Sequence, residues 1–398
     1  MTTAADLDLV IVGGCGHVGL PLALTFAEAG CRVGVYDIDQ AKVESVRGGQ
    51  MPFRERGADE LLPQLLAGGQ LEVSNDPATV GRADVIVLVI GTPIDRHMNP
   101  SFEVFEPVVR EMVPHMRTGA LVVLRSTVFP GTTELVAARL QDHGIEADVV
   151  FCPERVAEGF ALEENRRLPQ IVGAADDIGY QRAADLFGQL DVELIRVSPQ
   201  EAELAKLLTN TWRYMKFAIA NQFFQIAHRT GMDYNRVLHA VRHNYPRAAD
   251  LPGPGFAAGP CLFKDTMQLA AFSSDHFPMG HSAMLVNEGV PEYLIDAIER
   301  EGSIRGKTLG ILGMAFKGDS DDPRDSLSYK LRKLALFRGA EVICSDPFIQ
   351  APDFTTLADV LERSDIVVIG APHSEYRKLD WNGAKVVDIW GVTGAIAV

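Results

Sequence analysis

The sequence predicts an α/β protein in which two Rossmann-like, doubly wound domains are joined by a long central helix and a helical middle region. Two observations lead to this fold class. Short apolar runs rich in β-branched residues alternate with helical patterns at both ends of the chain, and residues 199 to about 229 contain no strong helix breaker. Strands that are apolar on both faces and alternate with helices are typical of parallel sheets covered by helices.

The N-terminal region begins with the pattern of a strand, a tight turn and a helix. Residues 7–13 form a short apolar run, and the apolar residues that follow recur with helical spacing. A second strand is expected at 32–37. Helical patterns fill most of the later intervals, so residues 1–198 are predicted to form one Rossmann-like domain. Its further strands are expected at 84–90, 120–125, 148–152, 170–172 and 192–197.

The rest of the chain divides into a helical middle region at 199–302 and a smaller Rossmann-like domain at 303–398. The stretch 245–260 is rich in Pro, Gly and Ala and is therefore expected to be an irregular loop. Helices are expected at 199–229, 232–241, from about 264, and at 281–300. A second alternation of strands and helices places strands at 307–313, 341–345, 365–369 and 385–388.

The composition limits the classes of function. The chain has 398 residues, 47% hydrophobic and 23% charged, which is typical of a globular protein and excludes a disordered one. The net charge is 37 − 53 = −16 and no run of Lys and Arg occurs, which argues against a nucleic-acid partner. The N-terminus lacks the basic segment of a signal peptide, and no stretch reaches the ~18 apolar residues of a membrane span. We therefore expect a cytoplasmic protein without a membrane partner.

A glycine-rich motif lies between the first predicted strand and helix. Gly14-Cys15-Gly16-His17-Val18-Gly19 matches G-x-G-x-x-G, and Asp37 ends the next strand 37 − 14 = 23 residues later. The glycines allow a pyrophosphate to approach the helix N-terminus, and the acid accepts hydrogen bonds from ribose hydroxyls. Because an acid at this position repels a 2′-phosphate, NAD is expected rather than NADP. A glycine turn needed only for packing is the alternative.

Polar residues follow three of the later strands. Thr92 and Thr127 lie where strands end, at the edge of the sheet that binds ligands, although hydroxyls there are often caps or turn formers. Glu154 and Glu158 follow the strand at 148–152. Their spacing is compatible with one helical face, and a solvated acidic turn is the alternative.

The long helix carries a polar stripe. Lys206, Asn210 and Arg213 stand at i, i+4 and i+7 and therefore share a face. A lysine flanked by leucines can donate to a developing alkoxide or act as an acid or base. A solvated helix face is the alternative.

One of the five cysteines has a distinct setting. The odd number of cysteines and the lack of a C-x-x-C pair predict free thiols and no metal site. Cys261 lies where a glycine-rich loop meets a helix, and Asp265 follows four residues later. A helix N-terminus favours the thiolate, so Cys261 is the candidate nucleophile, with a structural cysteine as the alternative. The other four cysteines are expected to be structural.

Taken in order, these motifs resemble those of the nucleotide-sugar 6-dehydrogenases, which include UDP-glucose and UDP-N-acetylmannosamine dehydrogenases. The resemblance extends over essentially the whole chain. It rests on the motifs 14–21, 126–128, 153–155, 203–210, 259–265, 316–317 and 322–326.

The resemblance implies a fold, a reaction and a set of residue roles. The family has an NAD-binding domain, a central helix that builds a homodimer, and a C-terminal domain that binds the UDP-sugar. It oxidises the sugar C6 alcohol to a carboxylate with two NAD. By this resemblance Cys261 attacks the intermediate aldehyde and Asp265 serves proton transfer. Lys206 and Asn210 stabilise oxyanions, Thr127 and Glu158 place water, Glu154 supports hydrolysis, Lys317 meets the substrate phosphate or sugar, and Arg324 reaches the NAD pyrophosphate.

Several residues look like the N-acetylhexosamine branch of the family. They imply UDP-N-acetylmannosamine as the substrate, and UDP-glucose is the alternative. The departures from that branch are Pro260 and Tyr245, where His is usual, and Gly318, where a basic residue can occur. A single-step β-hydroxyacid dehydrogenase and a regulator with an inactive site are the rivals. The substrate-binding candidates are Arg155, Val156, Lys206, Asn210, Arg213, Arg247, which would reach a neighbouring subunit, Gly255 and Lys317.

Overall fold

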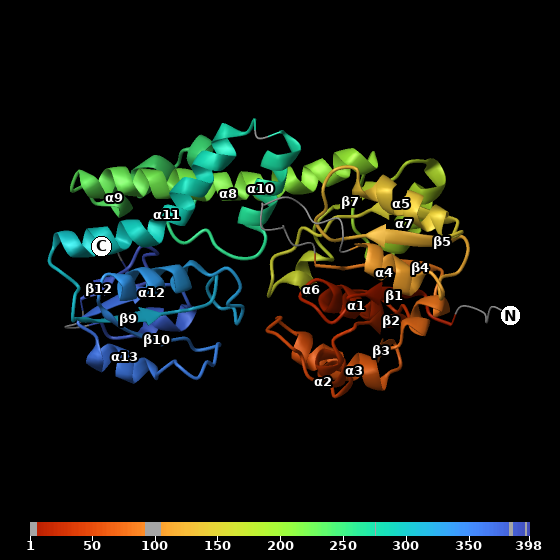
Figure 1. Ribbon diagram of the computed structural model, residues 1–398, viewed down its shortest axis with the longest axis horizontal. Coiled ribbons are helices and arrows are strands. Elements are labelled where there is room, and N and C mark those ends of the chain that lie inside the picture. Colours follow the sequence, from red (N-terminus) through yellow and green to blue (C-terminus); the bar gives the residue numbers. More distant parts are fainter. Residues whose placement is uncertain (1–5, 92–104, 275, 382–384, 395) are drawn as a thin grey trace. The chain divides into compact units, whose positions relative to one another are not determined.

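The computed structural model describes residues 6–91, 105–274, 276–381, 385–394 and 396–398. The chain divides into two compact units, residues 1–208 and 209–398, and each has its own sheet (Figure 1). The division falls inside the long helix α8 (Pro199–Arg229), whose range matches the predicted helix at 199–229. In the described ranges, no helix is both long and apolar enough to cross a bilayer.

The first unit is built on an eight-stranded sheet in the order β3-β2-β1-β4-β5-β6-β7-β8. Its first six strands have the order of a Rossmann sheet. The strands are β1 (Leu9–Val12), β2 (Val33–Tyr36), β3 (Leu71–Ser74), β4 (Val85–Leu88), β5 (Ala120–Leu124), β6 (Ala147–Phe151), β7 (Gln170–Gly173) and β8 (Leu194–Val197). The helices are α1 (Gly19–Glu28), α2 (Gln40–Arg47), α3 (Ala58–Ala67), α4 (Phe105–Met112), α5 (Thr132–Asp142), α6 (Ala161–Glu164) and α7 (Asp177–Gly188), with a 3₁₀ turn at Pro77–Arg82.

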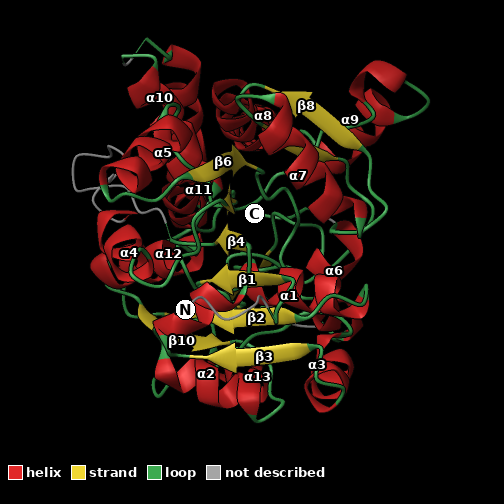
Figure 2. Cartoon of the chain, turned by 90° about the vertical axis from the view of Figure 1, so that its right-hand side faces the viewer, coloured by secondary structure: helices red, strands yellow, loops and turns green. Residues whose placement is uncertain are grey.

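Both faces of this sheet are buried. Leu9 and Ile11 of β1 belong to one apolar core, and Val10 and Val12 belong to a second core on the opposite face. Figure 2 shows α1 and α3 on one side of the strands and α4 and α5 on the other. Alternate residues of a strand point to opposite faces, so a strand covered twice must be apolar throughout. That pattern made the strands recognisable in the sequence.

Two features of the first sheet differ from the prediction. Strand β3 was not expected, because its four residues at the sheet edge offer only two large apolar side chains. The sheet is also mixed rather than parallel, since β6 and β7 pair antiparallel. The connection between them, residues 152–169, contains only the single helical turn α6. Its 18 residues are enough for a crossover, but they do not form the long helix that usually carries the chain to a parallel neighbour.

The second unit combines the helical middle with a four-stranded parallel sheet in the order β10-β9-β11-β12. One apolar core contains Phe224 of α8 together with Leu294 of helix α11 and Ile311 of strand β9, so the helices of the middle region pack on the sheet. The strands are β9 (Thr308–Leu312), β10 (Glu341–Ser345), β11 (Ile366–Ile369) and β12 (Val386–Val387). The helices after α8 are α9 (Tyr234–Arg242), α10 (Leu262–Phe272), α11 (Pro278–Arg300), α12 (Leu327–Phe337) and α13 (Leu357–Arg363), with 3₁₀ turns at Pro246–Ala248 and Ser374–Lys378.

Candidate active site

The turn between β1 and α1 has the geometry of a pyrophosphate cradle. A Cβ on Gly14 would lie 2.8 Å from the carbonyl oxygen of Ile11, and one on Gly19 would lie 2.6 Å from the Cα of Gly14. These two glycines therefore allow the helix to pack closely on the strand. A Cβ on Gly16 would meet only the carbonyl oxygen of Gly13, at 3.7 Å, so this position has room for a ligand. His17 and Val18, which complete the motif, are partly buried.

Asp37 lies at the end of β2, beside the same turn. Its Oδ2 accepts a hydrogen bond from the Cys15 backbone N–H at 2.9 Å, and its Oδ1 accepts one from Asp39 N–H at 3.0 Å. A carboxylate has about four acceptor positions, so these two bonds orient Asp37 and leave acceptor capacity for the hydroxyls of a ribose. The arrangement fits the dinucleotide site that the sequence predicts.

Sequence reasoning missed two side chains that support this region. The ring of Phe53 stacks on His17 with 4.1 Å between centroids. Glu55, which is buried, accepts hydrogen bonds from Gly159 N–H at 2.8 Å and Leu162 N–H at 3.3 Å. Glu55 therefore ties the loop after α2 to the segment that contains Glu158. No periodicity distinguishes a carboxylate that bonds across more than one hundred residues, so the sequence offered no signal.

The ends of β4 and β5 are joined by a side chain. The hydroxyl of Ser126 accepts a hydrogen bond from Ile90 N–H at 2.7 Å, and Thr127 follows, partly buried. Thr92, the other predicted hydroxyl, lies outside the described residues. Thr127 is thus placed at the carboxyl edge of the sheet, where ligands bind in such folds.

The segment after β6 is neither of the two forms that the sequence suggested. Residues 153–157 have no helical structure, so Glu154 and Glu158 do not share a helix face, and both are partly buried rather than solvated. Arg155 donates from Nη2 to the carbonyl of Pro169, and Val156 is partly buried. The physical reason is that this segment is held by side-chain bonds rather than by a helical ladder.

Lys206 is buried, which excludes a solvated helix face at this position. Its side chain is 4% exposed, and Nζ lies 2.5 Å from the carbonyl oxygen of Glu154 and 3.4 Å from its Oε2. A lysine ammonium is almost never buried without a partner, and here the partner is Glu154. The pair joins α8 to the segment after β6.

Three residues before Lys206, the fully buried Glu203 anchors the N-terminus of α5. Its carboxylate accepts hydrogen bonds from Thr133 N–H at 2.8 Å, Thr133 Oγ1 at 2.6 Å and Gly131 N–H at 2.6 Å. These donors belong to the start of α5, where a negative charge is favourable. Burial nonetheless raises the pKa of Glu203, against the opposing effect of its hydrogen bonds from Thr133 and Gly131. An acid on an apolar helix was the available signal, but its role was not predicted.

In the second unit, Asn210 and Asp265 form a buried pair. Asn210 Nδ2 donates to Asp265 Oδ2 at 2.5 Å, and Lys264 Nζ lies 3.6 Å from Asp265 Oδ1. Asp265 has no exposed surface. Asn210 of α8 and Asp265 of α10, which lie 55 positions apart in sequence, are thus brought together.

Cys261 differs from the other four cysteines. It is the exposed one, and it occupies the N-cap position of α10. Burial raises the pKa of the remaining thiols, to about 12 for Cys15 and Cys152, to about 11 for Cys344, and to a lesser extent for Cys31. Those four are protonated and inaccessible at neutral pH, whereas Cys261 is accessible beside a helix N-terminus.

The loop before Cys261 packs against the C-terminal sheet domain. Gly259 has a left-handed φ of +97°, and a Cβ there would lie 2.5 Å from the ring of Phe316. Gly255 lies so close to the Trp390 ring that a Cβ would approach it to 2.2 Å. Lys317, next to Phe316, is partly buried. The two sequence motifs at 259–265 and 316–317 therefore lie side by side.

Three predicted arginines lie on the surface of the second unit. Arg213 is exposed on α8, and Arg247 is exposed in the 3₁₀ turn, 5.8 Å from the ring of Tyr245. Arg324 is exposed, and its Nε donates to both carboxylate oxygens of Asp322 at 2.9 Å. All three guanidinium groups are accessible from solvent.

Family models match three consecutive parts of the chain. The NAD-binding domain of the UDP-glucose/GDP-mannose dehydrogenase family matches residues 8–191, its central domain matches 200–289, and its UDP-binding domain matches 310–395. The chain belongs to the UDP-glucose/GDP-mannose dehydrogenase family. The glycine turn and Asp37 lie in the part that matches the NAD-binding domain, so NAD is the cofactor.

Individual relatives agree with this membership and differ in substrate. UDP-N-acetyl-D-mannosamine dehydrogenase of Pyrococcus horikoshii is 29% identical, over 94% of this chain and 91% of the relative. UDP-glucose 6-dehydrogenase of Bacillus subtilis is 27% identical, over 90% and 86%. The solved structure of a UDP-glucose dehydrogenase from Pyrobaculum islandicum superposes with a TM-score of 0.90 at 30% identity, covering 97% of this chain and 94% of that one.

Membership of the UDP-glucose/GDP-mannose dehydrogenase family makes this protein an NAD-dependent nucleotide-sugar oxidoreductase with a UDP-binding domain. The predicted family and fold class are thereby confirmed. The identities of 27–29% with relatives that act on different sugars leave the individual sugar to the proposal below.

Proposed function

We propose that this enzyme oxidises the C6 alcohol of a UDP-N-acetylhexosamine, UDP-N-acetylmannosamine first among them, to the uronic acid through a thioester on Cys261. One observation carries the proposal. Cys261 is the exposed thiol, it begins α10, and Asp265 lies one turn further along, bonded to Asn210. An accessible thiol at a helix N-terminus is suited to nucleophilic attack.

The Cys261 thiol links the two oxidation steps, because it holds the intermediate covalently between them. The alcohol first loses a hydride and a proton and becomes an aldehyde. The Cys261 thiolate forms a C–S bond to the aldehyde carbon, and the thiohemiacetal loses a second hydride to give a thioester. Water then attacks the thioester and the C–S bond breaks. One alcohol, one water and two NAD give a carboxylate, two NADH and three protons, and the thiol is restored.

The remaining residues divide this work. Bound NAD supplies the hydride acceptor for both oxidations, and the glycine turn and Asp37 would hold it. Lys206 and Asn210, one turn apart on α8, would stabilise the oxyanions that form at C6. Asp265 would accept or return the proton that moves at Cys261. Arg324 would contribute positive charge to the NAD pyrophosphate. Thr127 and Glu158 would place the water, and Glu154 would assist hydrolysis.

Substrate binding is assigned to groups suited to an anionic nucleotide. Lys317 lies in the part that matches the UDP-binding domain, and its ammonium would bind a phosphate oxygen. Arg155, Val156, Arg213 and Gly255 would contact the sugar and its acetamido group. Support for the N-acetylhexosamine class comes from the P. horikoshii relative, while the B. subtilis relative supports UDP-glucose as the alternative.

The surface of α8 and α9 supports a homodimer as the working form. Trp212, Ile219 and Phe223 are exposed along α8, and Met232 is 60% exposed before α9. An apolar cavity of about 200 Å³ lies between these helices. A second copy of this helical surface would cover the patch, and Arg247 would then reach the neighbouring subunit. The residues that line the apolar cavity are Phe223, Ile226, Ala227, Met232, Tyr234, Val237, Leu238, Val241 and Leu251.

Three further assignments complete the proposal. Residues 1–198 would bind NAD, 199–302 would form the dimer and carry the catalytic thiol, and 303–398 would bind the nucleotide. Because the mechanism needs a reduced thiol, we place the enzyme in the cytoplasm, where thiols stay reduced.

Replacing the thiol tests the mechanism. Cys261→Ser should lower formation of the uronic acid by at least about 1,000-fold, since a protonated serine hydroxyl is a much weaker nucleophile than a thiolate and the thioester cannot form. Binding of NAD and UDP, measured by calorimetry, should be unchanged. Cys31→Ala is the matched control and should keep full activity. Turnover of Cys261→Ser close to wild type, or one NADH per product instead of two, would refute the thioester.

A substrate panel tests the sugar. NADH release should be greatest with UDP-N-acetylmannosamine among UDP-N-acetylmannosamine, UDP-N-acetylglucosamine, UDP-glucose and GDP-mannose. A higher kcat/KM with UDP-glucose would replace the proposed substrate by its alternative without changing the mechanism.

A further inference from the structure

Asp346 occupies, in the C-terminal sheet domain, the position that Asp37 occupies in the NAD-binding domain. Each acid ends the strand that pairs with the first strand of its sheet. Each also accepts a hydrogen bond from the turn that follows that first strand, from Cys15 N–H in one case and from Met314 N–H in the other. In a dinucleotide site this acid receives ribose hydroxyls. Its surroundings decide whether Asp346 has the same role.

The acceptor positions of Asp346 are already filled. The carboxylate has no exposed surface, and about four acceptor positions are available to it. It takes part in five hydrogen bonds, which leave none for a ribose hydroxyl. Oδ2 accepts from Met314 N–H at 2.6 Å, Ala315 N–H at 3.1 Å and His373 Nε2 at 3.1 Å, and Oδ1 accepts from Phe348 N–H at 2.8 Å and Ile349 N–H at 3.0 Å.

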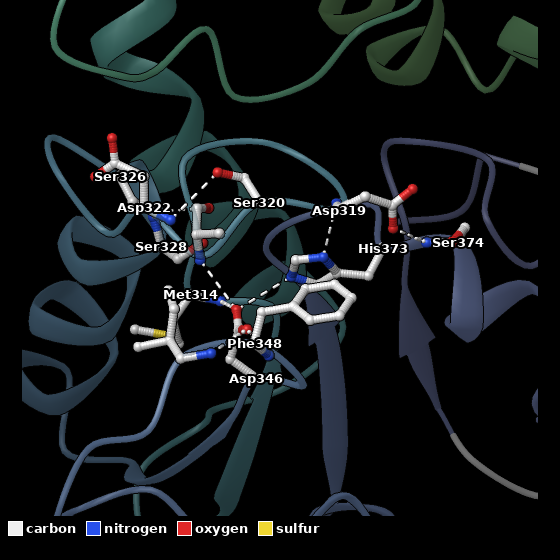
Figure 3. Close-up of polar contacts among 12 residues, drawn as sticks. Met314, Asp319, Ser320, Asp322, Ser326, Ser328, Asp346, Phe348, His373 and Ser374 are labelled. Carbon is white, nitrogen blue, oxygen red and sulfur yellow. Dashed lines mark hydrogen bonds and ion pairs between the residues drawn. The ribbon is translucent and has the colours of Figure 1, made fainter. Parts of the chain in front are cut away.

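The buried imidazole of His373 connects Asp346 to the far side of the turn. Its Nδ1 accepts a hydrogen bond from the Asp319 backbone N–H at 2.9 Å, and a nitrogen that accepts carries no proton. The proton therefore resides on Nε2, which donates to Asp346. Asp319 Oδ1 in turn accepts from Ser374 N–H at 2.8 Å (Figure 3). Both nitrogens of the ring are thus committed.

These contacts fix the turn on both sides of Lys317. Asp346 holds Met314 and Ala315 before the lysine, and His373 holds Asp319 after it. Gly318 approaches Pro372 so closely that a Cβ would lie 2.5 Å from the Pro372 carbonyl oxygen. The backbone of Lys317 is therefore held between Ala315, which Asp346 binds, and Asp319, which His373 binds. The His373 imidazole also bonds Asp346 and so connects the two anchors.

We infer that Asp346 and His373 are a positioning pair that fixes the backbone of Lys317 for the nucleotide, and that the ribose in this domain is recognised by other groups. The inference rests on the proposed contact between Lys317 and a phosphate. His373 acts through Lys317 and touches no ligand itself. Its removal frees the turn, and the lysine then loses conformational entropy when it binds, which weakens the complex.

Calorimetric titration with UDP and, separately, with NAD tests this inference on the full-length enzyme. His373→Leu removes both contacts and should weaken UDP binding by about 10-fold with NAD binding unchanged. His373→Asn places an amide oxygen near the position of Nδ1, keeps the Asp319 contact, and should remain within about threefold of wild type. Thr356→Ala, which removes the N-cap of α13, is the control for destabilisation and should leave UDP binding unchanged.

A double variant shows whether His373 acts through the lysine. Lys317→Ala alone should weaken UDP binding by about 10-fold, and adding His373→Leu should produce little further loss. Additive losses of about 100-fold would overturn the inference while leaving the proposed phosphate contact intact. If Lys317→Ala binds UDP as tightly as wild type, the proposed contact is wrong, and the inference falls with it. UDP binding by Thr356→Ala as weak as that of His373→Leu would also overturn it.

Discussion

The two sheet domains share a four-strand order, β2-β1-β4-β5 in one and β10-β9-β11-β12 in the other, but they differ in the turn that follows the first strand. In each, a glycine with positive φ follows the first strand, Gly13 at +72° and Gly313 at +90°. A Cβ on Gly13 would clash with the backbone of Val89, just after β4. A Cβ on Gly313 would clash with the backbone of Ala371, just after β11. Up to this point the two turns are equivalent.

Beyond the shared glycine the two turns diverge. Helix α1 begins at Gly19, 19 − 13 = 6 residues after the glycine, whereas α12 begins at Leu327, 327 − 313 = 14 residues after its counterpart. The first turn thus leads directly into a helix N-terminus, which is suited to a pyrophosphate. The second presents a loop with a cationic side chain, Lys317. In a protein of net charge −16, both turns would provide positive potential for the anionic ligands that we propose for them.

Asp37 and Asp346, the acids beside these two turns, also differ in their surroundings. Asp37 is a buried residue that uses about half of its acceptor capacity, while the side chain of Asp346 has no exposed surface and uses all of its acceptor positions. A shared position therefore does not imply a shared role. The number of backbone donors bonded to the acid differs, with two for Asp37 and four for Asp346.

Truncating the two acids should give the largest contrast. Asp346→Ala leaves backbone N–H groups and His373 without their buried acceptor and should lower the free energy of unfolding by about 4 kcal/mol. Asp37→Ala leaves only two backbone N–H groups without their acceptor, and should lower it by only about 1 kcal/mol but weaken NAD binding by more than about 10-fold. Urea unfolding and NAD titration measure the two effects. Equal losses of stability would contradict the division of roles.

The sequence predicted local motifs better than contacts between distant segments, and the reason is physical. A glycine motif followed by an acid at a fixed spacing is a local pattern, so Asp37 and the NAD site could be read from adjacent residues. Lys206 and Cys261 were also found, because a lysine on an apolar helix and a thiol at a loop-to-helix junction are local features. Lys206 pairs with Glu154, and Asp265 pairs with Asn210. In both pairs the partner lies far away in sequence, and neither pairing was predicted.

The supporting groups escaped prediction for the same reason. His373 reaches Asp319 across 54 residues and Asp346 across 27, and Glu55 reaches Gly159 across 104. Contacts of this kind depend on the packing of loops, which leaves no periodic trace in the sequence. The expected helix face for Glu154 and Glu158 was wrong because the same spacing occurs in a loop held by side chains.

A switch of cofactor preference from NAD to NADP also tests the role of Asp37, and its expected effect is smaller than that of truncating the acid. Ile38 is 78% exposed beside Asp37, so Asp37→Ser with Ile38→Arg removes the repelling carboxylate and adds a guanidinium for a 2′-phosphate. We expect kcat/KM with NADP to rise by about 10-fold and that with NAD to fall by a similar factor. Ile38→Arg alone is the control and should keep the preference for NAD. An unchanged ratio in the double variant would show that Asp37 does not face the ribose.

The smallest effect concerns pH, where two buried carboxylates should act in opposite directions. Burial works to raise the pKa of Asp346, but hydrogen bonds from His373 and the backbone outweigh it and leave this pKa below its ordinary value of 3.8. Its contribution to stability is therefore present above that value and is lost as the pH falls below it. Burial holds the pKa of Glu203 above its ordinary value of 4.5. The native state thus takes up this proton first, and acidification through that range stabilises it.

Urea unfolding from pH 7 to pH 3 should separate the two contributions. The difference in unfolding free energy between wild type and Glu203→Gln should change above about pH 4.5, with wild type gaining as the pH falls. The difference between wild type and Asp346→Asn should change below about pH 3.8, with wild type losing. Since the two carboxylates belong to different units, their effects should add in the double variant. A slope of the same sign for both would show that Asp346, like Glu203, is dominated by burial, and its hydrogen bonds would then not compensate its enclosure.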